Sequence, residues 1–182
     1  MKEGLTAIVF VKMPGNNIQF ESQTKAKLNN PEIQGIAQTM VKEGKTGVPE
    51  YAELKRRFGW EFNGMRLHEL YFGNMKNSSA VFDTGTALNQ KLLSDFGSYA
   101  DWEKDFKASG TMRGIGWTIL YYDPMGQRLF NVWVNEHDMG HLAGCKPLLI
   151  LDVFEHAYML DYGLKRADYI EAFFKAIDWD VV

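Results

Sequence analysis

The stretch LLILDVFEHAY, residues 148–158, decides both the fold and the candidate site of this protein. Its first four residues form an uninterrupted apolar run after Pro147, which predicts a strand buried on both faces, although a buried helix gives the same pattern. Asp152 lies at the end of this run, and His156 follows four residues later. A carboxylate there is unfavourable unless it is paired or binds a cation. The pattern therefore indicates either an Asp/His pair at a helix start or a cation site.

Two segments upstream of this stretch have the composition of β-strands. Residues 115–122 and 128–134 are rich in β-branched and aromatic side chains. They flank Asp123-Pro124-Met125-Gly126, a turn sequence with proline at its second position and glycine at its fourth. The sequence therefore predicts a β-hairpin.

The remaining periodic segments predict helices. Apolar residues recur at steps of three or four after Pro49, and this spacing places on one helix face Tyr51, Leu54, Phe58, Phe62, Met65, His68 and Phe72. His68 is therefore expected to point at the core. Further helices are expected at residues 32–42, at 88–93, from Tyr99 to a stop at Gly110, and at 166–177, the last with Ala167, Ile170, Phe173, Phe174 and Ile177 inward.

This order of elements predicts an α+β fold, in which an N-terminal helical hairpin domain precedes a C-terminal domain with a small antiparallel sheet surrounded by helices. The polar residues 76–86 are interpreted as the linker. The predicted domains are thus residues 1–86, helical, and residues 87–182, α/β.

Composition narrows the class of protein. The 182 residues are 46% hydrophobic with a net charge of -3, and no basic block is longer than Lys55-Arg56-Arg57, so a nucleic-acid partner is not expected. The single cysteine, Cys145, excludes an internal disulfide framework and favours a reducing compartment. The apolar run at residues 7–11 is too short to cross a membrane. We therefore expect a soluble, cytoplasmic protein without a membrane partner.

The combination of His68 with Asp152 and His156 favours metal binding. Each residue alone is more often a structural polar group, but together they are three ligand-competent side chains in regions otherwise occupied by aromatic residues. One carboxylate with imidazoles suits iron or manganese, whereas softer metals more often recruit thiolates. A second pattern, His137-x-x-x-His141, would suit zinc on a helix, but Gly140 argues against a helix there.

These residues resemble the iron/manganese superoxide dismutase family. The resemblance rests on residues 152–158, on the HELYF sequence at 68–72, and on residues 96–99 leading to the GIGW sequence at 114–117, and it extends from about residue 49 to residue 179. It implies a superoxide dismutase that converts superoxide to oxygen and hydrogen peroxide. It also implies one iron or manganese ion per chain, bound by His68, Asp152, His156, a histidine of the N-terminal helix and a solvent molecule.

The resemblance also assigns the residues around the metal. His137 takes the place of the family residue that hydrogen-bonds the bound solvent, and we expect it to be catalytic. An aromatic wall that keeps the metal dry corresponds to Trp117, Tyr71, Phe72 and Phe154, all of which are also compatible with an ordinary core. At the twofold interface, Glu155 would reach the partner's ligand histidine, which implies a homodimer or a dimer of dimers. Tyr158 normally contacts a gateway histidine of the neighbouring subunit in the family, and this chain lacks that histidine. Arg166 fits a structural or anion-attracting position near the substrate funnel.

One expected feature of the family is absent. The chain has no histidine before His68 and no tyrosine before Tyr51, so the first ligand and the channel tyrosine are missing. Gln19, Glu21 or water are the alternatives for the vacant position, and residues 22–25 lie near the place of the tyrosine. Loss of one imidazole predicts weaker metal binding and lower activity. Two other readings stay open: a metal-free structural or dimerisation homologue, and an aberrant N-terminal segment on an otherwise ordinary enzyme.

Overall fold

The computed structural model describes residues 30–77 and 82–182. Their contacts divide the chain into two compact units, Met1–Phe58 and Gly59–Val182. The dividing point lies within helix α2 (Pro49–Gly73). The domains 1–86 and 87–182 stay a prediction.

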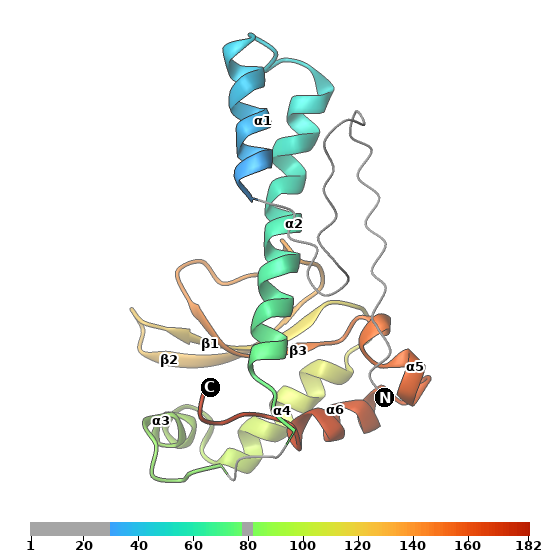
Figure 1. The fold of residues 1–182 in the computed structure, drawn as a ribbon. Helices are drawn as coiled ribbons and strands as arrows, with labels where there is room; N and C mark the ends of the chain where they lie inside the picture. Colours follow the sequence, from blue (N-terminus) through green and yellow to red (C-terminus); the bar gives the residue numbers. More distant parts are fainter. Residues whose placement is uncertain (1–29, 78–81) are drawn as a thin grey trace. The chain divides into compact units, whose positions relative to one another are not determined.

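The described part of the first unit contains α1 (Asn30–Lys42) and the first residues of α2. The chain reverses direction between them (Figure 1). Gly44 follows α1 with a φ of 69°, where the missing side chain removes the steric penalty, and the N–H of Lys45 bonds back to the Met40 carbonyl at 2.8 Å. Pro49 then occupies the first position of α2, where its missing N–H has no intrahelical partner to lose. The predicted helical hairpin is confirmed.

The second unit is built on a three-stranded antiparallel sheet with the order β2-β1-β3. Its strands are β1 (Trp117–Asp123), β2 (Arg128–Val134) and β3 (Lys146–Asp152). The predicted hairpin and the predicted strand after Pro147 are both confirmed. Trp117 pairs with Asp152 in the β1–β3 register, so these two residues lie on the same face of the sheet.

Helices surround this sheet. They are α3 (Ala87–Phe96), α4 (Tyr99–Thr111), the 3-10 helix η1 (Glu155–Ala157), α5 (Met159–Tyr162) and α6 (Arg166–Phe174). Thr86 and Ser98 cap α3 and α4, since each side chain accepts a backbone N–H three residues later. α4 contacts β1, β2 and α6 (Figure 1). The predicted α+β fold is confirmed.

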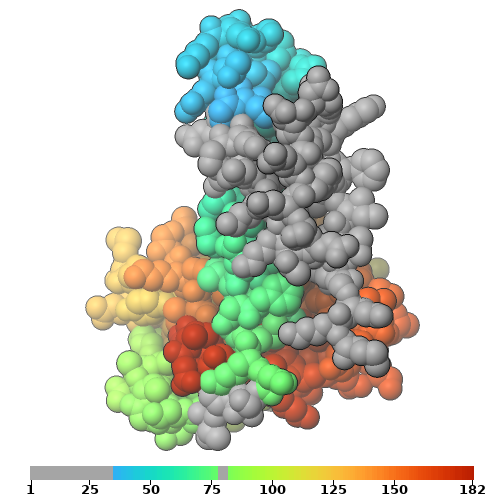
Figure 2. Space-filling model, in the orientation of Figure 1, coloured from blue at the N-terminus to red at the C-terminus, as the bar shows by residue number. Residues whose placement is uncertain are grey.

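The core of this unit lies between the sheet and α4. Its largest fully buried side chains include Trp102, Trp117, Phe106 and Leu92. The C-terminal residues, dark red in Figure 2, close one side of this core, where Trp179 packs on Trp102 with the ring centroids 5.9 Å apart. Because burial of aromatic side chains dominates core energetics, this cluster is expected to supply much of the stability of the unit. No helix in the described ranges is long and apolar enough to cross a membrane.

Three details of the helix predictions are wrong. The buried line of α2 is Gly64, Leu67 and Tyr71, while Phe58 and Phe72 are exposed. Apolar residues also occupy the positions next to the predicted stripe, so their spacing does not fix which line faces the core. His68 is consequently half-buried at the margin of that face.

In α6, Ala167 is exposed and Tyr169 is buried instead, and the helix ends at Phe174, although Ile177 is buried in a bridge with Met75. α4 also continues past Gly110. A Cβ at this position would lie 3.0 Å from Ile170 and 3.2 Å from Leu151, so the glycine permits close packing rather than ending the helix.

Candidate metal centre

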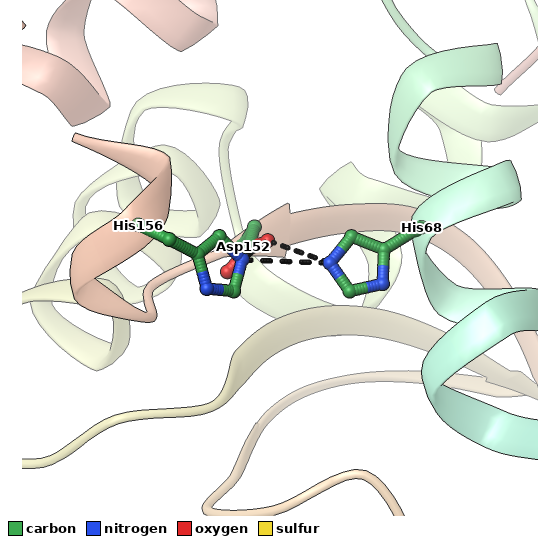
Figure 3. Close-up of side chains that lie close together, drawn as sticks. All are labelled: His68, Asp152 and His156. Atoms are coloured by element: carbon green, nitrogen blue, oxygen red, sulfur yellow. Dashed lines mark hydrogen bonds and ion pairs between the residues drawn. The ribbon is translucent and has the colours of Figure 1, made fainter. Parts of the chain in front are cut away.

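Three side chains from separate elements converge at one end of the sheet. Asp152 is the last residue of β3 and is 1% exposed. The backbone N–H of Phe154 donates to Asp152 Oδ1 at 3.0 Å, and the chain then enters η1, which carries His156. His68 approaches from α2 (Figure 3). All three residues belong to the unit 59–182.

The potential ligand atoms lie close together. His156 Nε2 is 3.0 Å from Asp152 Oδ2, His68 Nε2 is 3.5 Å from the same oxygen, and the two Nε2 atoms are 3.4 Å apart (Figure 3). Within the ranges 30–77 and 82–182, these residues form the one group of three or more histidine, cysteine or acidic side chains with metal-binding geometry. The carboxylate and the two imidazoles predicted from the sequence therefore do come together.

A hydrogen bond to the backbone fixes the proton of the His68 ring on one nitrogen and leaves a lone pair on the other. His68 Nδ1 lies 2.6 Å from the carbonyl oxygen of Gly64, one turn earlier in α2. Because a carbonyl only accepts, Nδ1 carries the donated proton, and Nε2 of the neutral ring is left with its lone pair directed at Asp152. A backbone carbonyl that orients a ligand histidine in this way is a common feature of metal sites.

The electrostatics at His156 also favour a cation. The hydrogen bond that the His156 ring donates to the Asp152 carboxylate raises the pKa of His156 above its usual value, and burial offsets part of this rise. The carboxylate thus stabilises positive charge at the position of the His156 ring. A metal ion bound by the same atoms would satisfy the carboxylate in place of a proton. One carboxylate oxygen with two imidazole nitrogens fits iron or manganese.

A pair of tyrosines supports Asp152 from behind. The Tyr169 hydroxyl donates to the Asp152 backbone carbonyl at 2.8 Å and lies 2.9 Å from the Tyr71 hydroxyl. Since Tyr169 uses its proton on the carbonyl, Tyr71 is the donor between the two phenols. Helical spacing alone gave no signal for this role of Tyr169. Tyr71, expected in the aromatic wall, acts on Asp152 through Tyr169.

His137 lies beside the ligand candidate His68 and has a defined protonation state. Trp117 Nε1–H donates to His137 Nδ1 at 3.0 Å, so the ring proton of neutral His137 is on Nε2. Burial, together with the neighbouring His68, lowers the pKa of His137 to about 4. The imidazole is therefore neutral near pH 7 and offers an N–H. Its ring is 5.9 Å from that of His68 and 4.9 Å from that of Phe154, measured between centroids.

The other expected site residues are exposed or contact neighbouring elements. Phe72 is 57% exposed and packs against Tyr71, rather than covering the ligand candidates. Glu155 is exposed, and Tyr158 stacks on Tyr169. The Arg166 guanidinium bonds to backbone carbonyls at the end of α4 and in the segment that follows it, among them that of Gly114 at 2.6 Å, and to the carbonyl of Val153.

The zinc alternative at His137 and His141 is not supported by the geometry. His141 uses both ring nitrogens for hydrogen bonds, Nδ1 with the Tyr121 hydroxyl and Nε2 with the His137 carbonyl oxygen, each at 2.6 Å. Neither nitrogen is directed at the His137 ring. The candidates for the missing first ligand, Gln19 and Glu21, and the segment 22–25 lie outside the described residues.

Comparison with known proteins gives two family matches. Residues 83–182 match the sequence model of the family described as iron/manganese superoxide dismutases, C-terminal domain. Residues 1–46 match the one described as DNA gyrase B. The first match covers more than half of the chain and includes Asp152 and His156. The second covers the segment in which the first ligand histidine was expected.

Individual relatives agree with the larger match. The chain is 44% identical over 117 residues to the manganese superoxide dismutase of Haloarcula marismortui, a match that covers 64% of this chain and 57% of the relative. It is 41% identical over 133 residues to the iron superoxide dismutase of Aquifex pyrophilus, covering 73% of this chain and 62% of the relative. The chain thus spans about three fifths of the length of each relative.

Proposed function

The chain belongs to the iron/manganese superoxide dismutase family, and on that premise we propose that it binds one iron or manganese ion per chain and dismutates superoxide. The observation that carries this proposal is the convergence of His68, Asp152 and His156, whose ligand atoms all lie within 4.8 Å of one another. Two superoxide anions and two protons would give one molecule of oxygen and one of hydrogen peroxide.

The residues would divide this task between them. His68, Asp152 and His156 would hold the ion, which when bound supplies one-electron redox chemistry of the metal between its divalent and trivalent states. Asp152 would lower the net charge of the site, and the Tyr71–Tyr169 pair would fix its backbone. His137 is neutral, carries its ring proton on Nε2 and lies beside His68, so it is the proposed donor of a proton to the reacting oxygen.

We attribute the absence of the first histidine to the N-terminal segment, because residues 1–46 match a different family from residues 83–182. The family match carries two ligand candidates and the proposed proton donor, whereas the segment expected to supply the fourth protein ligand resembles another protein family. Three protein ligands can hold a transition metal with water at the vacant position, but affinity and activity are then expected to be lower. Gln19 and Glu21 are the alternative donors, and glutamate is the better one because it is anionic.

A homodimer is proposed for the same surface. His156 and Glu155 are both exposed in the single chain, although a ligand histidine normally donates its second N–H to an acceptor. Glu155 from a twofold-related copy would supply that acceptor. Sedimentation equilibrium of the wild type and of Glu155→Gln tests this proposal. A dimer weakened by the substitution supports it, and an unchanged association state contradicts it.

The main proposal is tested by measuring metal content, with substitution of an exposed carboxylate as the control. The full chain and Asp152→Ala are each loaded separately with iron and manganese, and the exposed Asp161→Ala is the matched control. We expect about one ion per chain in the wild type and in Asp161→Ala, and loss of both the ion and superoxide consumption in Asp152→Ala.

A second candidate function, a metal-free dimeric scaffold, is favoured by the missing first histidine alone. Absence of metal from all three proteins, with their circular dichroism spectra intact, would support the scaffold and contradict the enzyme.

A further inference from the structure

The loop that carries His137 is attached to strand β1 at two points. Trp117 and Tyr121 are four residues apart on β1, so their side chains leave the same face of the sheet. Trp117 donates its indole N–H to His137 Nδ1 at 3.0 Å, and the Tyr121 hydroxyl lies 2.6 Å from His141 Nδ1. His137 and His141 are themselves four residues apart in the loop between β2 and β3. The two hydrogen bonds therefore form two rungs between one strand and one loop.

A third hydrogen bond connects the rungs. His141 Nε2 lies 2.6 Å from the backbone carbonyl oxygen of His137. The carbonyl can only accept, so Nε2 is the donor, and in the neutral ring Nδ1 accepts the proton of the Tyr121 hydroxyl. Burial raises the pKa of Tyr121 to about 12, so this phenol remains protonated and able to donate near neutral pH. Every group in the connected set therefore has a defined donor or acceptor role.

The loop backbone adopts the conformation that this arrangement requires. Gly140 lies between the two histidines with a φ of 92°, a region that residues with a side chain rarely adopt. On the other flank of His137, Glu136 accepts a hydrogen bond of 3.1 Å from Trp60 Nε1 of α2. His137 is thus attached on both sides, to α2 through Glu136 and to β1 through His141.

We propose that His141 is a positioning residue: held by Tyr121, it fixes the peptide carbonyl of His137 and thereby sets the angle at which the His137 ring meets Trp117. The indole hydrogen bond keeps the ring proton on Nε2, the face proposed to serve the reaction. Loss of the His141 contact would let the His137 peptide rotate and lengthen the Trp117 bond. The catalytic consequence rests on the proposed function, whereas the positioning itself does not.

The indole N–H of Trp117 reports this role in the metal-free full chain. The protein is labelled with 15N-tryptophan, and its five indole signals are assigned by substitution, starting with Trp117→Phe. Chemical shift and hydrogen-exchange rate are measured for wild type, His141→Ala, His141→Gln and Tyr121→Phe. Tyr122→Phe removes a hydroxyl from the next residue of β1 and is the matched control. The Trp102 indole, which donates to Asn131 at 3.0 Å, is the internal reference for an intact core.

We expect the Trp117 indole of His141→Ala and Tyr121→Phe to shift upfield and to exchange about ten-fold faster, with Trp102 unchanged. His141→Gln should restore the wild-type signal, because its amide can both donate to the His137 carbonyl and accept from Tyr121. A Trp117 signal that is unchanged in Tyr121→Phe and His141→Ala overturns the proposal. So does an equal change at Trp117 and Trp102, which would indicate general destabilisation. If His141→Ala does not fold, Tyr121→Phe and His141→Gln decide by the same criteria.

Superoxide consumption by the metal-loaded variants then tests whether the positioning by His141 also affects catalysis. With metal content unchanged, His141→Ala is expected to lose about ten-fold in rate and His141→Gln to recover it. If the variants change the Trp117 signal selectively but the wild type binds no metal, the proposed function is contradicted and the positioning role of His141 remains.

Discussion

The Tyr169 hydroxyl donates a 2.8 Å hydrogen bond to the backbone carbonyl of Asp152, the same residue whose carboxylate lies between two histidines. A single residue of β3 is therefore held from both sides, by α6 through its backbone and by the candidate metal centre through its side chain. The backbone of Asp152 cannot shift without breaking a buried hydrogen bond, so the end of the strand that carries its carboxylate is held in place before any ion binds.

Replacing Tyr169 by phenylalanine is expected to destabilise the fold and to loosen the candidate centre together. The substitution leaves the Asp152 carbonyl and the Tyr71 hydroxyl without their buried partner, at a cost of about 1–3 kcal/mol in the free energy of unfolding. Urea unfolding of the metal-free protein measures this cost. Tyr162→Phe, which removes a half-buried phenol beside Tyr169, is the control. Equal values for the two variants would show that the bond to Asp152 has no special weight.

Replacing Thr118 by valine is expected to stabilise the protein. Thr118 is fully buried, and in the described part of the chain its hydroxyl has no hydrogen-bond partner. Valine has nearly the same shape without the unpaired polar group, so the free energy of unfolding should rise by about 1 kcal/mol. Thr111→Val, at an exposed position, should not give this gain. A less stable Thr118→Val protein would contradict the absence of a partner.

Alkaline pH is expected to unfold the protein in part through Tyr121. Burial, more than the nearby Cys145, raises the pKa of this phenol to about 12, compared with about 10 in an unfolded chain. Its contribution to stability is therefore complete below pH 10 and is lost between pH 10 and 12, by about 1.4 kcal/mol per pH unit. Denaturant titrations at several alkaline pH values measure the slope. Tyr121→Phe should reduce it, and identical slopes would show that Tyr121 ionises freely in the folded state.

Replacing Arg166 by lysine is expected to lower stability although the charge is kept. The guanidinium reaches several backbone carbonyls at once, including those of Gly114 at 2.6 Å and Thr111 at 3.4 Å, whereas an ammonium group cannot match this fork. We expect a loss of about 1–3 kcal/mol in the free energy of unfolding, measured with urea. The adjacent Lys165→Ala should change it far less. If salt-dependent superoxide consumption changes instead, with stability intact, Arg166 would have the anion-attracting role.

The three strands of the second unit could be predicted because each has a strong local signal, whereas the short helices η1 and α5 were not predicted. The turn at residues 123–126 and the apolar run after Pro147 sufficed for the strand assignments, and both agree with β1, β2 and β3. The buried line of α2 could not be predicted. Tyr71 and Phe72 are neighbouring aromatic residues, and only packing against the rest of the unit decides that Tyr71 is buried and Phe72 is not.

Some residues of the candidate centre could likewise be predicted from the sequence, and others could not. Asp152 and His156 stand out locally, because a carboxylate and an imidazole are unexpected beside an apolar run. The contacts of His141 and Tyr169 had no such signal, since each depends on a partner at least 17 residues away in the chain, Tyr121 and Asp152 in the two cases. A tyrosine in an aromatic-rich helix has the same appearance whether its hydroxyl supports a carbonyl or only fills space.

The division of the chain inside α2 has an evolutionary consequence. His68, Asp152 and His156 all lie after residue 58, so the three convergent donors are inherited as one piece whatever sequence precedes them. Recombination upstream of this point can replace the N-terminal sequence without disturbing the three-donor arrangement. Residues 1–46 match a different family from residues 83–182, which is compatible with such an exchange.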